Sequence, residues 1–137
     1  MPSEEPTPEF SFSELLKDLY YPSESDEPVD FVNVPVQFEP PLTIGHVRDL
    51  LLITPEIYVE EIPEAAFWEP VVMDQDGYEE EEKRRTVRFA ELRQQIESIL
   101  MNRQVFRVGE VEVALYLLGR KADGFWAGLK TTVVETT

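Results

Sequence analysis

The chain contains 137 residues, of which 42% are hydrophobic and 29% charged, and its formal net charge is −16. A chain of this length has room for one hydrophobic core, so we expect a single domain. The absence of cysteine excludes a disulfide framework, a thiolate zinc site and a cysteine nucleophile. There is no signal-peptide pattern and no apolar run near the roughly 20 residues that span a bilayer, which predicts a cytoplasmic protein with no membrane partner.

The acidic residues are concentrated in the first part of the chain. Residues 1–82 contain 2 basic and 22 acidic residues, whereas residues 83–137 contain 10 basic and 6 acidic residues. A surface of one charge sign repels nucleic-acid phosphates and attracts basic surfaces. The distribution therefore argues against direct nucleic-acid binding and favours a basic protein partner, with acidity that serves only solubility as the alternative.

The N-terminal region predicts a tail followed by a short helix. Residues 1–10 are rich in proline and glutamate, so we expect a mobile tail there and a single domain over 11–137. Ser11 and Glu14 form a capping pair at the start of an amphipathic helix over roughly 12–20. Pro22 ends this helix.

Short elements are expected in the next segment, because every one of the 11 prolines lies at or before Pro70. A β-branched and aromatic run over 29–38 predicts a strand, and Pro35 makes it an edge strand or a broken one. Thr43 can cap a short helix that continues to Leu51. A strand at 57–60 and a long excursion over 61–78 follow.

The second half predicts longer elements. Acidic residues followed by basic ones complement the dipole of a helix over about 79–101. Its buried face is the stripe of Phe89, Leu92, Ile96, Ile99 and Leu100. Strands at 105–108, 111–118 and 125–134, joined by short turns that contain glycine, predict an antiparallel meander and hence an α+β fold.

The sequence contains no pattern that is typical of an enzyme or a cofactor protein. His46 is the only histidine, and beside Val47 we interpret it as a structural or surface residue. No glycine-rich phosphate loop is present. A calcium loop with Gly77 at its sixth position would place Val72 and Lys83 at ligand positions, which excludes it. We predict a non-enzymatic protein with no cofactor and no metal site of its own.

The acidic loops are the candidate recognition elements. A carboxylate can replace a phosphate oxygen against arginine or Mg²⁺ because both are hard anionic oxygen ligands. In the loop Ser23-Glu24-Ser25-Asp26, the hydroxyls can bond to the backbone and leave Glu24 to project. The alternative is an ordinary loop that ends a helix.

Several motifs of the chain, taken in order, resemble a known family. They are the block Gln104-Val105-Phe106-Arg107-Val108-Gly109-Glu110-Val111-Glu112-Val113, then Tyr116-Leu117-Leu118-Gly119, Ala127-Gly128 and Val133-Val134-Glu135-Thr136, preceded by Ser23-Glu24-Ser25 and Asp76-Gly77-Tyr78-Glu79-Glu80-Glu81. The chain is similar to the cyanobacterial nuclease A inhibitor family over about residues 12–136. The resemblance implies a three-layer α/β/α sandwich, similar to the pathogenesis-related-protein type, around a mixed or antiparallel sheet.

The resemblance also implies a function. A family member occludes the active site of a basic, metal-dependent, sugar-nonspecific DNA/RNA endonuclease and protects the producing cell; we expect a monomer in a 1:1 complex. The expected partner-binding residues are Ser23, Glu24, Ser25, Asp26, Asp76, Tyr78, Glu79, Glu80, Glu135, Thr136 and Thr137. Of these, Glu24 and the C-terminal Thr136 and Thr137 would approach the Mg²⁺ ion of the nuclease. The alternatives are an acidic interaction module that inhibits no nuclease, and a protein that binds a small molecule or a metal.

The chain departs from the family pattern at two positions. The family carries a Trp-Tyr pair where this chain has Gly77-Tyr78, and Trp68 or Trp126 could supply an aromatic contact, although we expect both in the core or sheet. The chain also extends one residue past Thr136, to Thr137, and one residue adds up to about 3.4 Å of reach.

Overall fold

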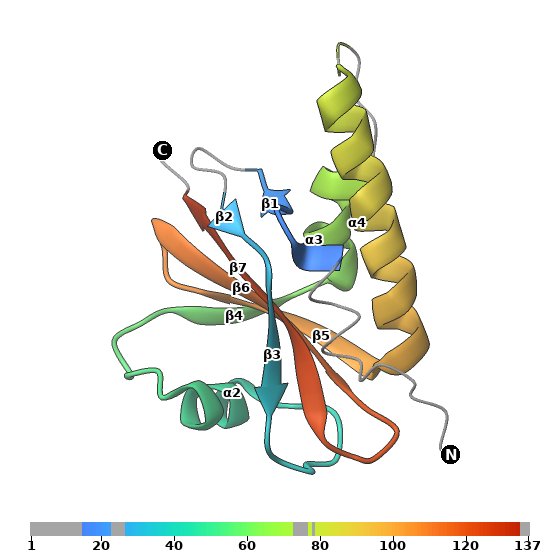
Figure 1. Cartoon of the computed structure of the whole chain (residues 1–137). Coiled ribbons are helices and arrows are strands. Elements are labelled where there is room, and N and C mark those ends of the chain that lie inside the picture. The colour runs from blue at the N-terminus through green and yellow to red at the C-terminus, as the bar shows by residue number, and fades with distance from the viewer. Residues whose placement is uncertain (1–14, 23–26, 73–76, 78, 135–137) are drawn as a thin grey trace, which may run out of the picture.

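The structure is a computed structural model that describes residues 15–22, 27–72, 77 and 79–134. Its centre is a five-stranded antiparallel sheet with the strand order β3-β7-β6-β5-β4 (Figure 1). The strands are β3 (Asp30–Val34), β4 (Val59–Ile62), β5 (Met101–Val108), β6 (Glu112–Arg120) and β7 (Trp126–Val134). A separate two-stranded sheet pairs β1 (Tyr20–Tyr21) with β2 (Glu27–Pro28).

Helices cover both faces of the five-stranded sheet, as Figure 1 shows: α2 (Ile44–Leu51) on one side, and α3 (Glu64–Val72) and α4 (Glu80–Ile99) on the other. Strand alternation explains the two cores. Leu115 and Leu117 of β6 pack with the residues of α3 and α4, whereas Leu118 packs with Val47 of α2. The predicted α+β fold and three-layer arrangement are confirmed.

The C-terminal meander and the main helix are confirmed as well. β5, β6 and β7 pair consecutively and antiparallel, and the predicted stripe of α4 faces the core. β5 starts four residues earlier than predicted, at Met101, because Leu100 is fully buried at the junction and the chain turns directly from helix to strand. Gly128 is required in β7, since a Cβ there would collide with the carbonyl oxygen of Leu117.

The predicted helix over 12–20 is wrong at its C-terminal end. Within residues 15–20, the described part of this segment, only Leu15 and Leu16 are helical, and Tyr20 already belongs to β1. The guanidinium of Arg88 donates hydrogen bonds to the carbonyl oxygens of Leu15, Lys17 and Asp18, so α4 satisfies the end of this helix. Beyond this short helix, Leu19 and Tyr21 are buried and Tyr20 between them is exposed, which is the alternation of a strand.

The predicted excursion over 61–78 contains a helix that the sequence did not indicate. Pro70 lies inside α3 and removes one backbone hydrogen bond, which made a helix improbable from local rules. Phe67, Trp68 and Val71 are buried between the sheet and α4, and their burial outweighs that loss. The neighbouring strand β4 lies at Val59–Ile62, two residues later than expected.

The elements of the first half otherwise follow the prediction. β3 is an edge strand and ends just before Pro35. The Oγ1 atom of Thr43 accepts a hydrogen bond from the backbone N–H of His46 at 3.0 Å. The Nδ1 atom of His46 in turn accepts one from the N–H of Thr43 at 3.1 Å. This reciprocal cap makes His46 a structural residue at the start of α2.

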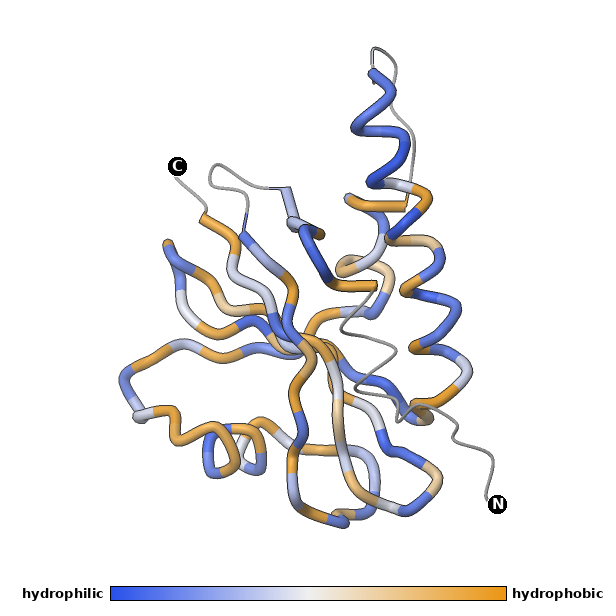
Figure 2. Tube along the Cα trace, viewed as in Figure 1, coloured by the Kyte–Doolittle hydropathy of each residue, from blue (hydrophilic) through white to orange (hydrophobic). Residues whose placement is uncertain are grey.

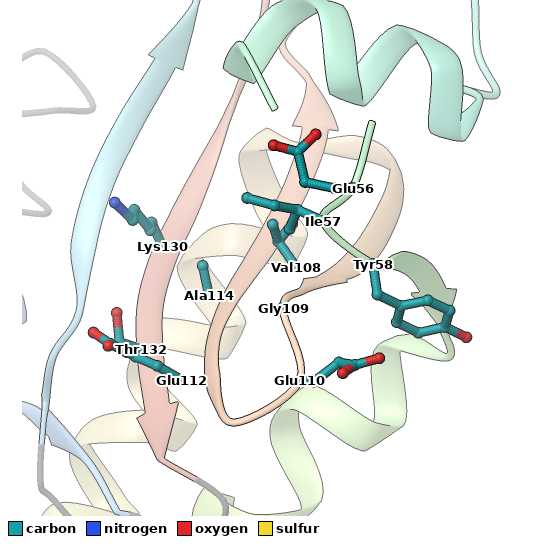
Figure 3. Close-up of a pocket in the computed structure, with 10 residues that line it drawn as sticks. All are labelled: Glu56, Ile57, Tyr58, Val108, Gly109, Glu110, Glu112, Ala114, Lys130 and Thr132. Carbon is teal, nitrogen blue, oxygen red and sulfur yellow. The ribbon is translucent and has the colours of Figure 1, made fainter. Parts of the chain in front are cut away.

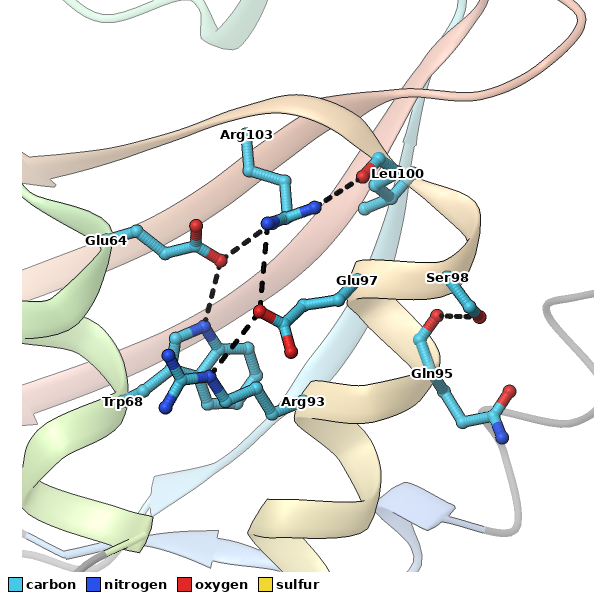
Figure 4. Close-up of polar contacts among 8 residues, drawn as sticks. All are labelled: Glu64, Trp68, Arg93, Gln95, Glu97, Ser98, Leu100 and Arg103. Carbon is cyan, nitrogen blue, oxygen red and sulfur yellow. Dashed lines mark hydrogen bonds and ion pairs between the residues drawn. The ribbon is translucent and has the colours of Figure 1, made fainter.

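A polar network fastens α3 and the end of α4 to β5 (Figure 4). The Oε2 atom of Glu64 accepts hydrogen bonds from Trp68 Nε1 at 3.1 Å and from Arg103 Nε at 2.7 Å. Arg103 also donates to the carbonyl oxygen of Leu100 at 2.7 Å. Trp68 and Trp126 are both fully buried, as expected for core residues, so neither supplies an exposed aromatic contact.

The buried hydroxyl of Tyr21 makes the fold less stable as the pH becomes alkaline. This hydroxyl donates a hydrogen bond to the carbonyl oxygen of Phe67 at 2.7 Å, and burial raises the pKa of Tyr21 above its ordinary value of 10. The folded state therefore keeps a proton that the unfolded chain releases. The resulting stability is fully present below pH 10 and decreases as the pH rises above it.

We expect the free energy of unfolding of the native protein to fall, relative to that of Tyr21→Phe, by about 1.4 kcal/mol per pH unit above pH 10. Denaturant unfolding of both proteins between about pH 8 and pH 11 measures this difference. The Tyr21→Phe variant is the control for lysines and exposed tyrosines that titrate in the same range. Parallel pH profiles for the two proteins would contradict the prediction.

Candidate partner-binding surface

Most of the predicted partner-binding residues lie outside the described part of the chain. These are Ser23, Glu24, Ser25, Asp26, Asp76, Tyr78, Glu135, Thr136 and Thr137. Glu79 and Glu80 are described, and both are exposed. For the other residues the structure describes only the flanking elements, namely β1, β2, the start of α4 and the end of β7.

The elements that flank two of these segments are adjacent. β1 and β2 bracket Ser23–Asp26 and pair with each other, with Tyr21 opposite Glu27. The Oγ1 atom of Thr131 in β7 donates a hydrogen bond to the carbonyl oxygen of Pro28 at 3.0 Å. Thr131 lies three residues before the end of β7 at Val134. The hairpin base and the last residues of β7 therefore lie side by side at one end of the sheet (Figure 1).

The first turns of α4 lie at the same end of the molecule, on the other side of β1 (Figure 1). Glu79 is the residue before the helix, and Glu80, Glu81 and Glu82 form an acidic first turn that complements the helix dipole. Figure 2 shows that the outer turns of α4 are hydrophilic. Because β1 and β2 lie between α4 and β7, the order across this end is β7, β2, β1, α4. The start of α4 and the end of β7 therefore lie at the same end of the molecule, with β1 and β2 between them (Figure 1).

Gly77, where the family pattern has tryptophan, is exposed and has a φ of +88°. That backbone conformation favours glycine over residues with a side chain. No heavy atom lies within 4 Å of a Cβ built at this position. The Cβ atom of another residue would therefore meet no atom here, but the backbone conformation would be strained.

A concave region, which the sequence did not predict, lies on the α2 side of the sheet. We call it the acidic groove; it has a volume of about 540 Å³ and is lined by Glu56, Ile57, Tyr58, Val108, Gly109, Glu110, Glu112, Ala114, Lys130 and Thr132. In Figure 3, Lys130 lies on the side opposite Tyr58 and Glu110. The walls of the groove come from the segment before β4 and from the β5–β6 turn, which lies about fifty residues further along the chain.

The polar groups near the acidic groove are held by local hydrogen bonds. The Glu56 carboxylate accepts hydrogen bonds from its own backbone N–H and from Thr54, and these lower the pKa of Glu56. The Tyr58 hydroxyl donates to Glu60 Oε2 at 2.7 Å, and this hydrogen bond raises the pKa of Tyr58. The Gly109–Glu110 turn was visible in the sequence, but nothing there indicated that residues 56–58 would contact it.

The described part of the chain offers surfaces for recognition. Within the described ranges, no group of three or more histidine, aspartate or glutamate residues is arranged to hold a metal ion. Across the same ranges, no helix is both long and apolar enough to cross a membrane. These surfaces carry carboxylates beside exposed aromatic and aliphatic side chains. This combination suits contact with a cationic protein surface.

Comparison with protein families places almost the whole chain in a known family. Residues 10–136 match the family described as Nuclease A inhibitor-like protein. A search of curated proteins found no match. The matched range contains every predicted partner-binding residue except Thr137. An inhibitor-like family implies a protein partner such as a nuclease and suggests a non-enzyme. Because the match extends over almost the whole length, the chain belongs to the Nuclease A inhibitor-like protein family.

Proposed function

We propose that this protein inhibits a metal-dependent, sugar-nonspecific DNA/RNA endonuclease by binding to its active site and occluding it, and so protects the producing cell. One observation carries the proposal beyond the family name. The elements that flank the Ser23–Asp26 segment, the Glu135–Thr137 segment and the acidic start of α4 lie at one end of the molecule. Segments from three parts of the sequence can thus contact one partner together.

The chemistry of these segments suits a nuclease active site. A nuclease that cuts both DNA and RNA must bind phosphate, so its active site presents cations and a divalent metal ion. In our proposal Glu24 and the C-terminal Thr136 and Thr137 direct oxygen ligands toward that Mg²⁺ region. Tyr78, Glu79 and Glu80 contact the surrounding basic surface. The inhibitor acts as a cytoplasmic monomer in a 1:1 complex and needs no cofactor or metal of its own.

The test is a titration of the purified protein into a plasmid-degradation assay. The assay contains a nonspecific nuclease of the ββα-metal type in excess Mg²⁺, and a pancreatic-type nuclease serves as the control. We expect stoichiometric inhibition of the first enzyme alone. No inhibition at micromolar excess would contradict the proposal and favour the alternative, an acidic interaction module on the same scaffold that binds another basic protein.

The net charge of −16 predicts a strong effect of salt on complex formation. Opposite charges steer two proteins together, and salt screens this attraction over about 8 Å at physiological ionic strength. We expect the association rate with the nuclease to fall by roughly tenfold or more between low and high salt. The dissociation rate should change much less. Stopped-flow measurements over a range of ionic strength give both rates, and an association rate independent of salt would contradict steering.

A further inference from the structure

The face of the sheet that carries α2 is covered only in part. α2 and its neighbours bury Phe106, Leu118 and Trp126 completely. Toward the other end of the same face, Ala114 and Thr132 are only half-buried, and they form the floor of the acidic groove (Figure 3). In the described part of the chain no helix packs over this floor, so the groove is an uncovered sheet face at the end where β7 terminates.

The walls of the acidic groove combine negative charge with exposed apolar surface. Glu110 and Glu112 are exposed, and neither forms an ion pair with any residue that the structure describes, whereas the exposed Glu56 interacts with the charge of Arg48. Ile57 is 39% exposed and Tyr58 50% exposed on the same rim. Exposed aromatic and aliphatic side chains beside exposed carboxylates are typical of a protein contact surface.

We infer that the acidic groove binds an arginine side chain of the basic protein partner. A guanidinium group is planar and can donate two parallel hydrogen bonds to one carboxylate, here that of Glu110, which lies on the Tyr58 side of the groove (Figure 3). It can also stack on the ring of Tyr58, while its aliphatic stem covers Ile57. Lys130 does not occupy this part of the groove, because its ammonium lies 5.7 Å from the ring centre of Tyr116 on the opposite side.

The walls of the groove are already held in place without a partner. The guanidinium of Arg48 donates hydrogen bonds to the carbonyl oxygens of Thr54 at 2.8 Å and Ile57 at 2.7 Å. The backbone N–H of Gly109 donates to the carbonyl oxygen of Tyr58 at 2.8 Å. Gly109 has a φ of +104°, and a Cβ there would lie 2.6 Å from the carbonyl oxygen of Glu112, so this turn requires glycine. A preformed groove binds without the entropic cost of ordering its loops.

The first test needs no nuclease. The peptide acetyl-Gly-Arg-Gly-amide is titrated into isotope-labelled protein, and amide chemical shifts are followed by NMR. We expect the largest shifts at Gly109, Ala114 and Thr132, and a dissociation constant about tenfold larger in the double variant Glu110→Gln/Glu112→Gln. The control Glu69→Gln/Glu91→Gln removes two exposed charges from α3 and α4 and should bind as the native protein does. Shifts spread over the whole acidic surface, or equal affinities for both variants, would overturn the inference.

The second test uses the nuclease, because the identity of the partner rests on the proposed function. We expect the groove variant to bind the nuclease about tenfold more weakly than the control variant. Equal binding by both variants would overturn the groove contact and leave the proposed function standing. If the native protein fails to bind the nuclease, the proposed function fails, and the peptide titration alone then decides whether the groove takes arginine.

Discussion

Replacing Glu24 with alanine is expected to raise the inhibition constant for the nuclease by roughly 30-fold or more. In the proposed complex this carboxylate lies in a site from which water is excluded, opposite the cations that normally bind phosphate. Removing it leaves those cations without a partner, and the cost of one unpaired buried charge is about 2–5 kcal/mol. The plasmid-degradation assay, repeated over inhibitor concentrations, measures the constant.

Glu91→Ala is the matched control for Glu24→Ala. Glu91 is exposed on α4, and the variant removes one negative charge from a surface away from the flanking elements of the predicted contact segments. It should lower the association rate slightly and leave the inhibition constant within a few-fold of the native value. If Glu24→Ala behaved like Glu91→Ala, the acidic loop would not enter the nuclease active site, and the interaction-module alternative would gain support.

The largest effect on stability is expected for Trp68→Ala, which should reduce the free energy of unfolding by about 3–5 kcal/mol. The Trp68 side chain is fully buried, and its ring packs edge-on against Phe67 with 4.8 Å between ring centres. Truncation leaves a cavity between α3 and α4, and it removes the Nε1 donor to Glu64. Urea unfolding, with the slope of the transition checked for two-state behaviour, measures the loss.

Trp68→Phe separates the two contributions. Phenylalanine keeps most of the buried ring but cannot donate a hydrogen bond to Glu64, so the loss should be about 1–2 kcal/mol. Arg103 remains bound to Glu64 at 2.7 Å in this variant, because that ion pair does not involve the indole. Equal losses for the alanine and phenylalanine variants would show that the polar network, and not cavity formation, determines the contribution of Trp68.

In the proposed function, the departure at Gly77 affects which nuclease the protein binds. An aromatic residue near the centre of an interface commonly contributes about 2 kcal/mol or more, and this chain lacks it at that position. Neither buried tryptophan replaces it. The exposed rim of the acidic groove carries Ile57 and Tyr58, and at the adjacent turn Val111 is 61% exposed. These side chains offer apolar contact area on another part of the surface.

The predictable elements were those whose pattern is local. The position of α4 followed from its apolar stripe and the charge order of its first turns, and the meander followed from alternation and glycine turns. α3 was missed because the local effect of Pro70 opposes a helix, whereas the burial of Phe67 and Trp68 that stabilises it depends on α4 and the sheet. The first helix was predicted too long because Arg88, some seventy residues away, satisfies its last carbonyl groups.

By itself, the sequence determined the fold class, the antiparallel meander, the separation of acidic and basic halves and the family to which the chain belongs. These depend on residue type and spacing along the chain, which a sequence states directly. Only the tertiary structure decided that β2 packs beside the end of β7 through Thr131, and that residues 56–58 meet the turn at Gly109. Such contacts join residues about fifty to one hundred positions apart, and they exist because two helical layers bury the faces of one sheet and thereby bring distant segments to the same end.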